Sequence, residues 1–120
     1  MLNLDTHILL FALAGELKKK EEALLSRQPW GISSIVFWEI NKLAQLGRIE
    51  IDLDDVELKR TLARLHVWPL TGEICRCIEG LGLHVDPVDE IIAATSVMHK
   101  VPLVTRDRNL RRSKRVPTAP

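Results

Sequence analysis

The chain has 120 residues, 46% of them hydrophobic, and a formal net charge of +1, so it carries enough apolar material for one domain with one core. No apolar run approaches the roughly 20 residues that span a bilayer, which excludes a transmembrane protein. Cys75 and Cys77 are too close in sequence for an ordinary disulfide and too few for a zinc site. Because Asp5 and His7 lie at the apolar start and no Lys or Arg precedes it, we expect no export signal and a cytoplasmic protein.

The hydrophobic pattern alternates between short strands and amphipathic helices. Caps and breakers set the boundaries: Asp5 with Thr6 begins the first helix, Gly47 ends the third, and Asp86-Pro87 begins the last. In chain order the pattern predicts a strand at residues 2–4, helices at 6–13 and 16–27, a strand at 29–32, helices at 34–46 and 54–65, a strand at 66–70, helices at 71–81 and 86–100, a strand at 101–105 and a brief fifth strand at 116–117. This alternation predicts an α/β fold, with a mainly parallel sheet of four to five strands covered by helices.

Four carboxylates border core-forming segments, where an unpaired acid is costly. Asp5 and Asp107 each follow a predicted strand, and Glu39 and Asp89 lie in early turns of helices. Because the carboxyl ends of parallel strands meet at one edge of the sheet, these acids can converge there. Acids gathered against a core repel one another unless cations are supplied, and a divalent metal ion is the simplest supplier.

Each acid also has a purely structural interpretation. Asp5 would cap a helix, Asp107 would begin a turn, and Glu39 would pair with Lys42. This interpretation is weakest for Glu39, because its neighbours on the helix are apolar. It is strongest for Asp86, because the Asp-Pro start signal already accounts for this residue.

The basic residues are concentrated near the C-terminus. Six of the ten residues 106–115 are basic and one is acidic, which gives this segment a charge of +5 and leaves −4 for the remainder. Clustered arginines beside an acidic site suit a polyanion such as a nucleic-acid backbone, so we expect phosphate contacts from Arg106, Arg108, Arg111 and Arg112. A solvated tail is the alternative.

Four segments, taken in order, carry a family resemblance: LDTHILL at residues 4–10, SIVFWEI at 34–40, DPVD at 86–89 with IAAT at 92–95, and LVTRD at 103–107. Together they resemble the PIN-domain nucleases, and in particular the VapC-type toxins of bacterial toxin-antitoxin pairs. The likeness extends from residue 2 to about residue 117, so we expect residues 1–120 to form a single PIN-like domain.

The resemblance implies a three-layer α/β/α fold with an acidic pocket that binds Mg²⁺ or Mn²⁺ and cleaves RNA endonucleolytically. It also implies a homodimer that is inhibited by a cognate antitoxin protein. By motif position, the expected catalytic and metal-binding residues are four acids supported by two hydroxyl groups: Asp5, Glu39, Asp89 and Asp107, with Thr6 and Thr105.

The chain departs from the family pattern at one position, because Glu90 follows Asp89 where an Arg is usual. This reversal of charge favours an alternative function, a catalytically silent PIN-like module that binds RNA or an antitoxin. A receiver-like phosphoacceptor domain also gathers acids at strand ends. It would need an Asp after the third strand, and residues 67–70 offer none.

Overall fold

The computed structural model describes all of residues 1–120, and strands and helices alternate along it as predicted. The strands are β1 (Leu2–Leu4), β2 (Trp30–Ser33), β3 (His66–Trp68) and β4 (Leu103–Val104). The helices are α1 (Thr6–Ala14), α2 (Lys19–Leu25), α3 (Ile35–Gln45), α4 (Val56–Ala63), α5 (Gly72–Cys77), the 3-10 helix η1 (Ile78–Gly80), α6 (Pro87–His99) and α7 (Arg108–Arg112). None of these helices is both long and apolar enough to cross a bilayer.

All four strands are parallel, in the order β3-β2-β1-β4, which confirms the predicted parallel sheet. β1 lies inside the sheet, where Asn3 pairs with Gly31 on one side and with Leu103 on the other. All three residues of β1 are buried, as expected for a strand covered on both faces. Beyond β4, a single bridge joins Leu103 to Thr118, one residue past the predicted fifth strand.

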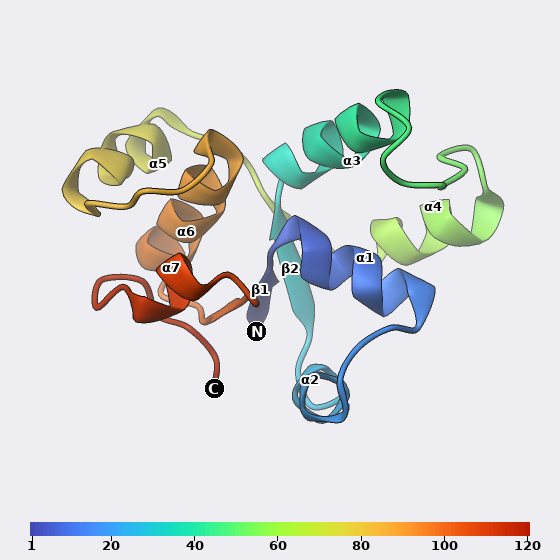
Figure 1. Cartoon of the computed structure of the whole chain (residues 1–120), viewed down its shortest axis with the longest axis horizontal. Coiled ribbons are helices and arrows are strands. Elements are labelled where there is room, and N and C mark those ends of the chain that lie inside the picture. The colour runs from blue at the N-terminus through green and yellow to red at the C-terminus, as the bar shows by residue number, and fades with distance from the viewer.

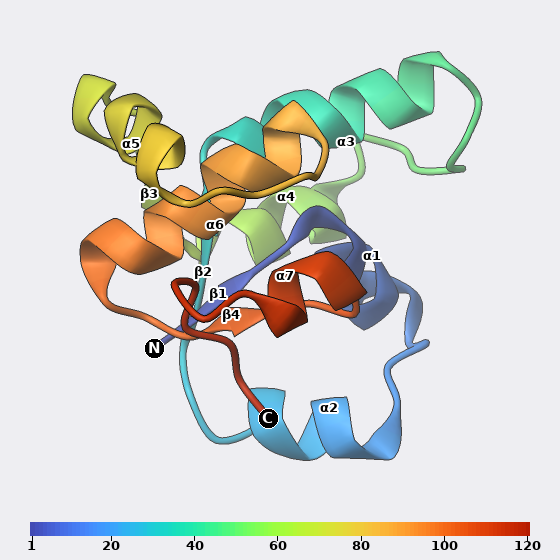
Figure 2. The same ribbon diagram turned by 60° about the vertical axis from the view of Figure 1, so that its left-hand side comes forward.

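Helices cover both faces of the sheet, which confirms the three-layer arrangement. In Figure 1 the strands run between α6, which is backed by α5, and α1, and Figure 2 shows the same layers after a turn of 60°. α3 leaves the upper end of β2 and contacts both α1 and α6. One core cluster of 18 buried residues joins sheet and helices, and it includes Leu4, Ile32 and Leu103 from the strands and Ile8 and Ile92 from the helices.

Helix α7 was not predicted. Its five residues are too few and too polar to show helical periodicity, and it forms because the Asp107 carboxylate accepts a capping hydrogen bond from the Leu110 N–H at 3.0 Å. The C-terminal segment is anchored to the core and does not form a solvated tail, because Leu110 within α7 and Val116 and Ala119 after it are all buried. The third strand ends at Trp68, just before Pro69.

Candidate active site

Asp5 lies at the carboxyl end of β1, the edge at which parallel sheets bind their ligands. It is only 6% exposed, and both of its oxygens accept hydrogen bonds. Oδ1 accepts from the backbone N–H of Ile8 at 2.8 Å, and Oδ2 accepts from the hydroxyl of Thr105. Burial raises the pKa of Asp5, and these two hydrogen bonds oppose the rise. Asp5 therefore caps α1, as its structural interpretation predicted, and it also lines an acidic cavity.

Asp107 follows β4, the strand that lies beside β1. Its backbone N–H donates to the Thr105 hydroxyl oxygen at 3.0 Å. The Thr105 hydroxyl therefore links the two acids, because it donates to Asp5 and accepts from the Asp107 backbone. Since β1 and β4 are parallel neighbours, Asp5 and Asp107 lie at the same edge of the sheet.

Asp89 lies in the first turn of α6, and buried polar contacts hold this helix against β1. The amide nitrogen of Asn3 donates to the carbonyl oxygen of Ile92 at 3.1 Å and to the hydroxyl of Ser96 at 2.9 Å. Asp89 lies one helical turn before Ile92, so these contacts place Asp89 beside the end of β1. Sequence reasoning missed Asn3, and the available signal was a polar residue in the middle of an apolar strand.

The charges of the acids act on one another. The pKa of Asp89 is raised to about 7, first by burial and then by the negative charges of four other carboxylates: Glu39, Asp5, Asp86 and Asp107. Coulomb interactions weaken with distance and are screened by water, so acids scattered over the surface would not have this effect. Asp5, Asp89 and Asp107 line one cavity together with Asp86, whereas Glu39 does not line it and acts on Asp89 only through its charge.

Glu39 lies in the second turn of α3, and it is half-buried. Its Oε1 is a buried acceptor with no hydrogen-bond partner. None of the salt bridges joins Glu39 to Lys42, so the predicted structural pair does not form. Thr6 is buried as well, and its hydroxyl has no hydrogen-bond partner, so only Thr105 of the two predicted supporting hydroxyls contacts an acid.

A cavity of about 390 Å³ opens over the acids and is lined by Asp5, Asp86, Asp89 and Asp107 together with His7 and Arg106. The structural interpretation of Asp86 as a helix cap does not account for its side chain. Asp86 is the N-cap residue of α6, but its side chain accepts no capping hydrogen bond and lines the cavity instead. The sequence signal was its spacing of three residues from Asp89, which places both acids on one face of a helical turn.

The site suits a hard divalent cation in its donor chemistry. As the side chains stand, no three carboxylates, histidines or cysteines converge closely enough to bind one ion. The donors are nevertheless carboxylate oxygens, which Mg²⁺ and Mn²⁺ prefer. A cation among Asp5, Asp89 and Asp107 would also offset the negative charges that, after burial, raise the pKa of Asp89. The residues therefore fit such an ion.

The four predicted phosphate-binding arginines differ in how the fold uses them. Arg106 donates from Nη2 to Oε1 of Glu21 at 2.7 Å and from Nε to Oε2 at 2.9 Å. Its guanidinium also packs over the ring of Phe11, with its Cζ 3.9 Å from the ring centroid. Arg106 therefore reaches the edge of the acidic cavity with part of its hydrogen-bonding capacity already used.

Arg111 is also engaged within the fold. Its Nη1 donates to the carbonyl oxygens of Thr105 and Ala119, both at 3.2 Å. The side chains of Arg108 and Arg112 are exposed and make neither a hydrogen bond nor a salt bridge. Arg108 and Arg112 are therefore the predicted arginines most available to a ligand.

Comparison with known proteins identifies the family. The PIN domain family model matches residues 3–116. In fold, the chain is similar to a toxin-antitoxin complex from Klebsiella pneumoniae, with 20% identity, a TM-score of 0.74, and coverage of 98% of this chain and 97% of that one. It is similar to VapBC2 from Rickettsia felis bound to a promoter DNA fragment, with 20% identity, a TM-score of 0.74, and coverage of 99% and 98%. It is also similar to DNA-bound VapBC from Salmonella typhimurium, with 21% identity, a TM-score of 0.68, and coverage of 98% and 96%. No curated protein sequence matches the chain. Because the family match spans nearly the whole chain, the protein belongs to the PIN domain family.

Proposed function

We propose that the protein is a Mg²⁺- or Mn²⁺-dependent endoribonuclease, the VapC-like toxin of a toxin-antitoxin pair, acting in the cytoplasm as a single PIN-like domain over residues 1–120. The observation that carries this proposal is the cavity lined by Asp5, Asp86, Asp89 and Asp107, in which burial, and then the charges of neighbouring carboxylates, raise the pKa of Asp89 to about 7. Family membership and the fold shared with toxin-antitoxin complexes support the same function.

The residues that would hold the ion are Asp5, Glu39, Asp89 and Asp107, with Asp86 adding negative charge. When bound, the ion would supply Lewis-acid chemistry at the scissile phosphate and lower the pKa of the attacking water. The two hydrogen bonds to Asp5 hold its carboxylate in one orientation, so it is prepared for binding without further ordering. The positive charges of the C-terminal arginines offset the negative charge of the acidic cavity and attract the RNA backbone toward it.

The test is cleavage of RNA by the purified chain in Mg²⁺ or Mn²⁺, compared with the same reaction in EDTA and with the Asp5→Asn variant. Asn keeps an oxygen that accepts from the Ile8 N–H but removes the charge. We expect fragments only from the wild-type chain with metal present. Equal cleavage by Asp5→Asn, or cleavage that survives EDTA, would refute the proposed chemistry.

The alternative function is a catalytically silent module that holds RNA or an antitoxin at the same site. The observation that favours it is Glu90, which stands where the family usually has an Arg. Glu90 does not line the acidic cavity, so its charge does not directly oppose a phosphate bound there. Binding of RNA without cleavage at any Mg²⁺ or Mn²⁺ concentration would favour this module.

A cognate antitoxin and a homodimer complete the proposal. An apolar cavity of about 510 Å³ adjoins the acidic one and shares His7 and Phe11 with it. A partner segment with apolar residues and one basic residue would fill the first cavity and neutralise the second. Trp38 on α3 is 55% exposed, and Leu46, directly after that helix, is 54% exposed, which supports a contact between two copies. Light scattering of the purified chain, alone and with the antitoxin, tests both parts.

A further inference from the structure

Two basic cavities lie beside the C-terminal segment. The first, which we call the α2 cavity, has a volume of about 330 Å³, and its charged lining residues are Lys18, Lys20, Glu21, Arg106, Arg108 and Arg111. The second, which we call the distal cavity, has a volume of about 320 Å³, and its basic lining residues are His84, Arg112, Lys114 and Arg115. The chain therefore offers a polyanion two directions in which to leave the acidic site.

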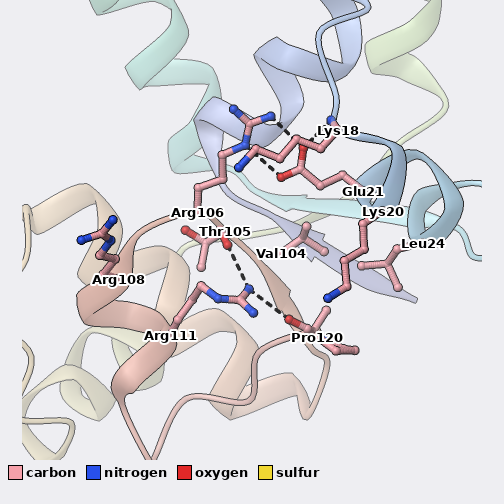
Figure 3. A pocket seen from close by; sticks show the side chains of 11 residues that line it. Lys18, Lys20, Glu21, Leu24, Val104, Thr105, Arg106, Arg108, Arg111 and Pro120 are labelled. Atoms are coloured by element: carbon pink, nitrogen blue, oxygen red, sulfur yellow. Dashed lines mark hydrogen bonds and ion pairs between the residues drawn. The ribbon is translucent and has the colours of Figure 1, made fainter.

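Of these two basic cavities, only the α2 cavity adjoins the acidic cavity. Arg106 lines both of them, whereas no residue of the distal cavity lines the acidic one. Figure 3 shows Lys18 and Lys20 approaching the α2 cavity from the α2 side, and Arg108 and Arg111 approaching it from the C-terminal side. Segments almost 90 residues apart in sequence thus supply positive charge to one hollow, next to the carboxylates.

The charge of the α2 cavity is largely free to meet a ligand. Lys18, Lys20 and Arg108 are exposed, and their side-chain nitrogens donate no hydrogen bond and form no salt bridge within the chain. Glu21 is the single acid of the lining, and it is occupied by Arg106. Successive phosphates of a single RNA strand lie several ångströms apart, so a strand held at the acids extends its next phosphates into an adjoining cavity.

We propose that the RNA strand leaves the acidic site through the α2 cavity, where Lys18, Lys20 and Arg108 bind its backbone phosphates. This inference rests on the proposed ribonuclease function and adds the course of the substrate and two lysines from α2. Glu21 limits the affinity of the α2 cavity for RNA, because it competes with the phosphates for Arg106, which lies between the α2 cavity and the acidic cavity. The distal cavity lies off the path.

The experiment measures binding of a short, fluorescein-labelled oligouridine to the full-length chain by anisotropy, in EDTA, over a range of salt concentrations. Phosphate contacts do not depend on base sequence, so oligouridine reports them. The double variant Lys18→Gln/Lys20→Gln should bind about tenfold more weakly near 0.15 M salt and flatten the slope of log K against log salt by about 1.4, since each contact to a single strand contributes about 0.7.

Two matched variants control for loss of charge alone. Lys19→Gln changes a lysine of the same helix that does not line the cavity, and Lys114→Gln/Arg115→Gln removes two charges from the distal cavity. Both should stay within about twofold of the wild-type affinity. Glu21→Gln should bind more tightly than wild type, because it releases Arg106. Equal losses in the α2 and distal double variants, or a larger loss in the distal one, would overturn the path.

Cleavage of RNA by the wild-type chain in Mn²⁺ is measured in parallel, so that the two proposals fail separately. If the wild-type chain cleaves RNA but the Lys18→Gln/Lys20→Gln variant binds oligouridine as tightly as the wild type, the proposed path is overturned and the ribonuclease function is retained. Affinity that depends on these lysines, with no cleavage, would overturn the ribonuclease and retain the α2 cavity as an RNA-binding surface.

Discussion

The Thr105 hydroxyl donates a hydrogen bond to Oδ2 of Asp5, which joins two side chains that lie 100 residues apart in sequence. Both residues are buried, and they sit at the ends of the neighbouring parallel strands β4 and β1. Because the same hydroxyl accepts from the Asp107 N–H, one small side chain orders two of the acids.

Replacing Thr105 with Val should therefore weaken both stability and activity. Val has nearly the same shape but leaves the Asp107 N–H without its acceptor and Asp5 without its donor, and a buried group left unpaired costs about 1–3 kcal/mol. The pKa of Asp5 should rise further, which moves the acidic limb of the pH–rate profile to higher pH. Urea denaturation and pH–rate profiles measure the two effects. Thr105→Ser should restore both, and a Val variant with a wild-type profile would contradict this role for the hydroxyl.

Asp5→Asn and Asp5→Ala should differ in stability while both lose cleavage. Either change removes a buried charge, but only Asn keeps an acceptor for the Ile8 N–H at the start of α1. Loss of a helix cap costs about 1 kcal/mol, so in EDTA the Ala variant should be less stable than the Asn variant by roughly that amount. Thermal unfolding of the two proteins provides the measurement. Equal melting temperatures of the two variants would show that the capping hydrogen bond contributes little to stability.

The metal-free protein should become less stable as pH rises from about 4 to about 7. In the folded chain the pKa of Asp89 is raised from its ordinary value of 3.8 to about 7, so between these values the folded state binds more protons than the unfolded state. Stability from this group is complete below pH 3.8 and is lost as pH rises through 7, by about 2 kcal/mol once the shift is discounted for the partial solvent exposure of Asp89. Unfolding in EDTA at several pH values measures it. The control is Asp89→Asn, whose stability relative to wild type should increase across this range, and a constant difference would show that Asp89 titrates normally.

Mn²⁺ should raise the melting temperature of the wild-type chain and should do so much less in Glu39→Gln. A ligand that binds only the folded state at 100 times its dissociation constant adds about 2.7 kcal/mol, and Gln removes the charge that the buried Glu39 oxygen offers to the ion. In EDTA the variant should be at least as stable as wild type, because like-charge repulsion falls. Glu79→Gln, an exposed acid of η1, is the matched control. A Mn²⁺ shift of equal size in all three proteins would remove Glu39 from the metal site.

Much of the fold could be predicted from local sequence signals. Apolar runs, the Asp5 cap and the Asp86-Pro87 start predicted the strands and most helices, because these signals act within a few residues of one another. Helix α7 was not predicted because it is supported by one capping carboxylate and not by a periodic hydrophobic pattern. The same local logic did not account for the side chain of Asp86, because a cap position does not reveal where a side chain points.

What the sequence alone determined was the kind of residue available: acids beside core segments, hydroxyls near two of them and a basic C-terminal stretch. The tertiary structure decided which of these groups meet. The order of the parallel strands sets Thr105 against Asp5, and the Asn3 contacts to α6 bring Asp89 to the same edge. The ion pair between Arg106 and Glu21 joins α2 to the C-terminal segment, so that Lys18 and Lys20 line the same cavity as Arg108, whereas Arg112 lines the distal cavity. The physical reason is that electrostatic coupling depends on distance in space, and contacts between distant segments set that distance.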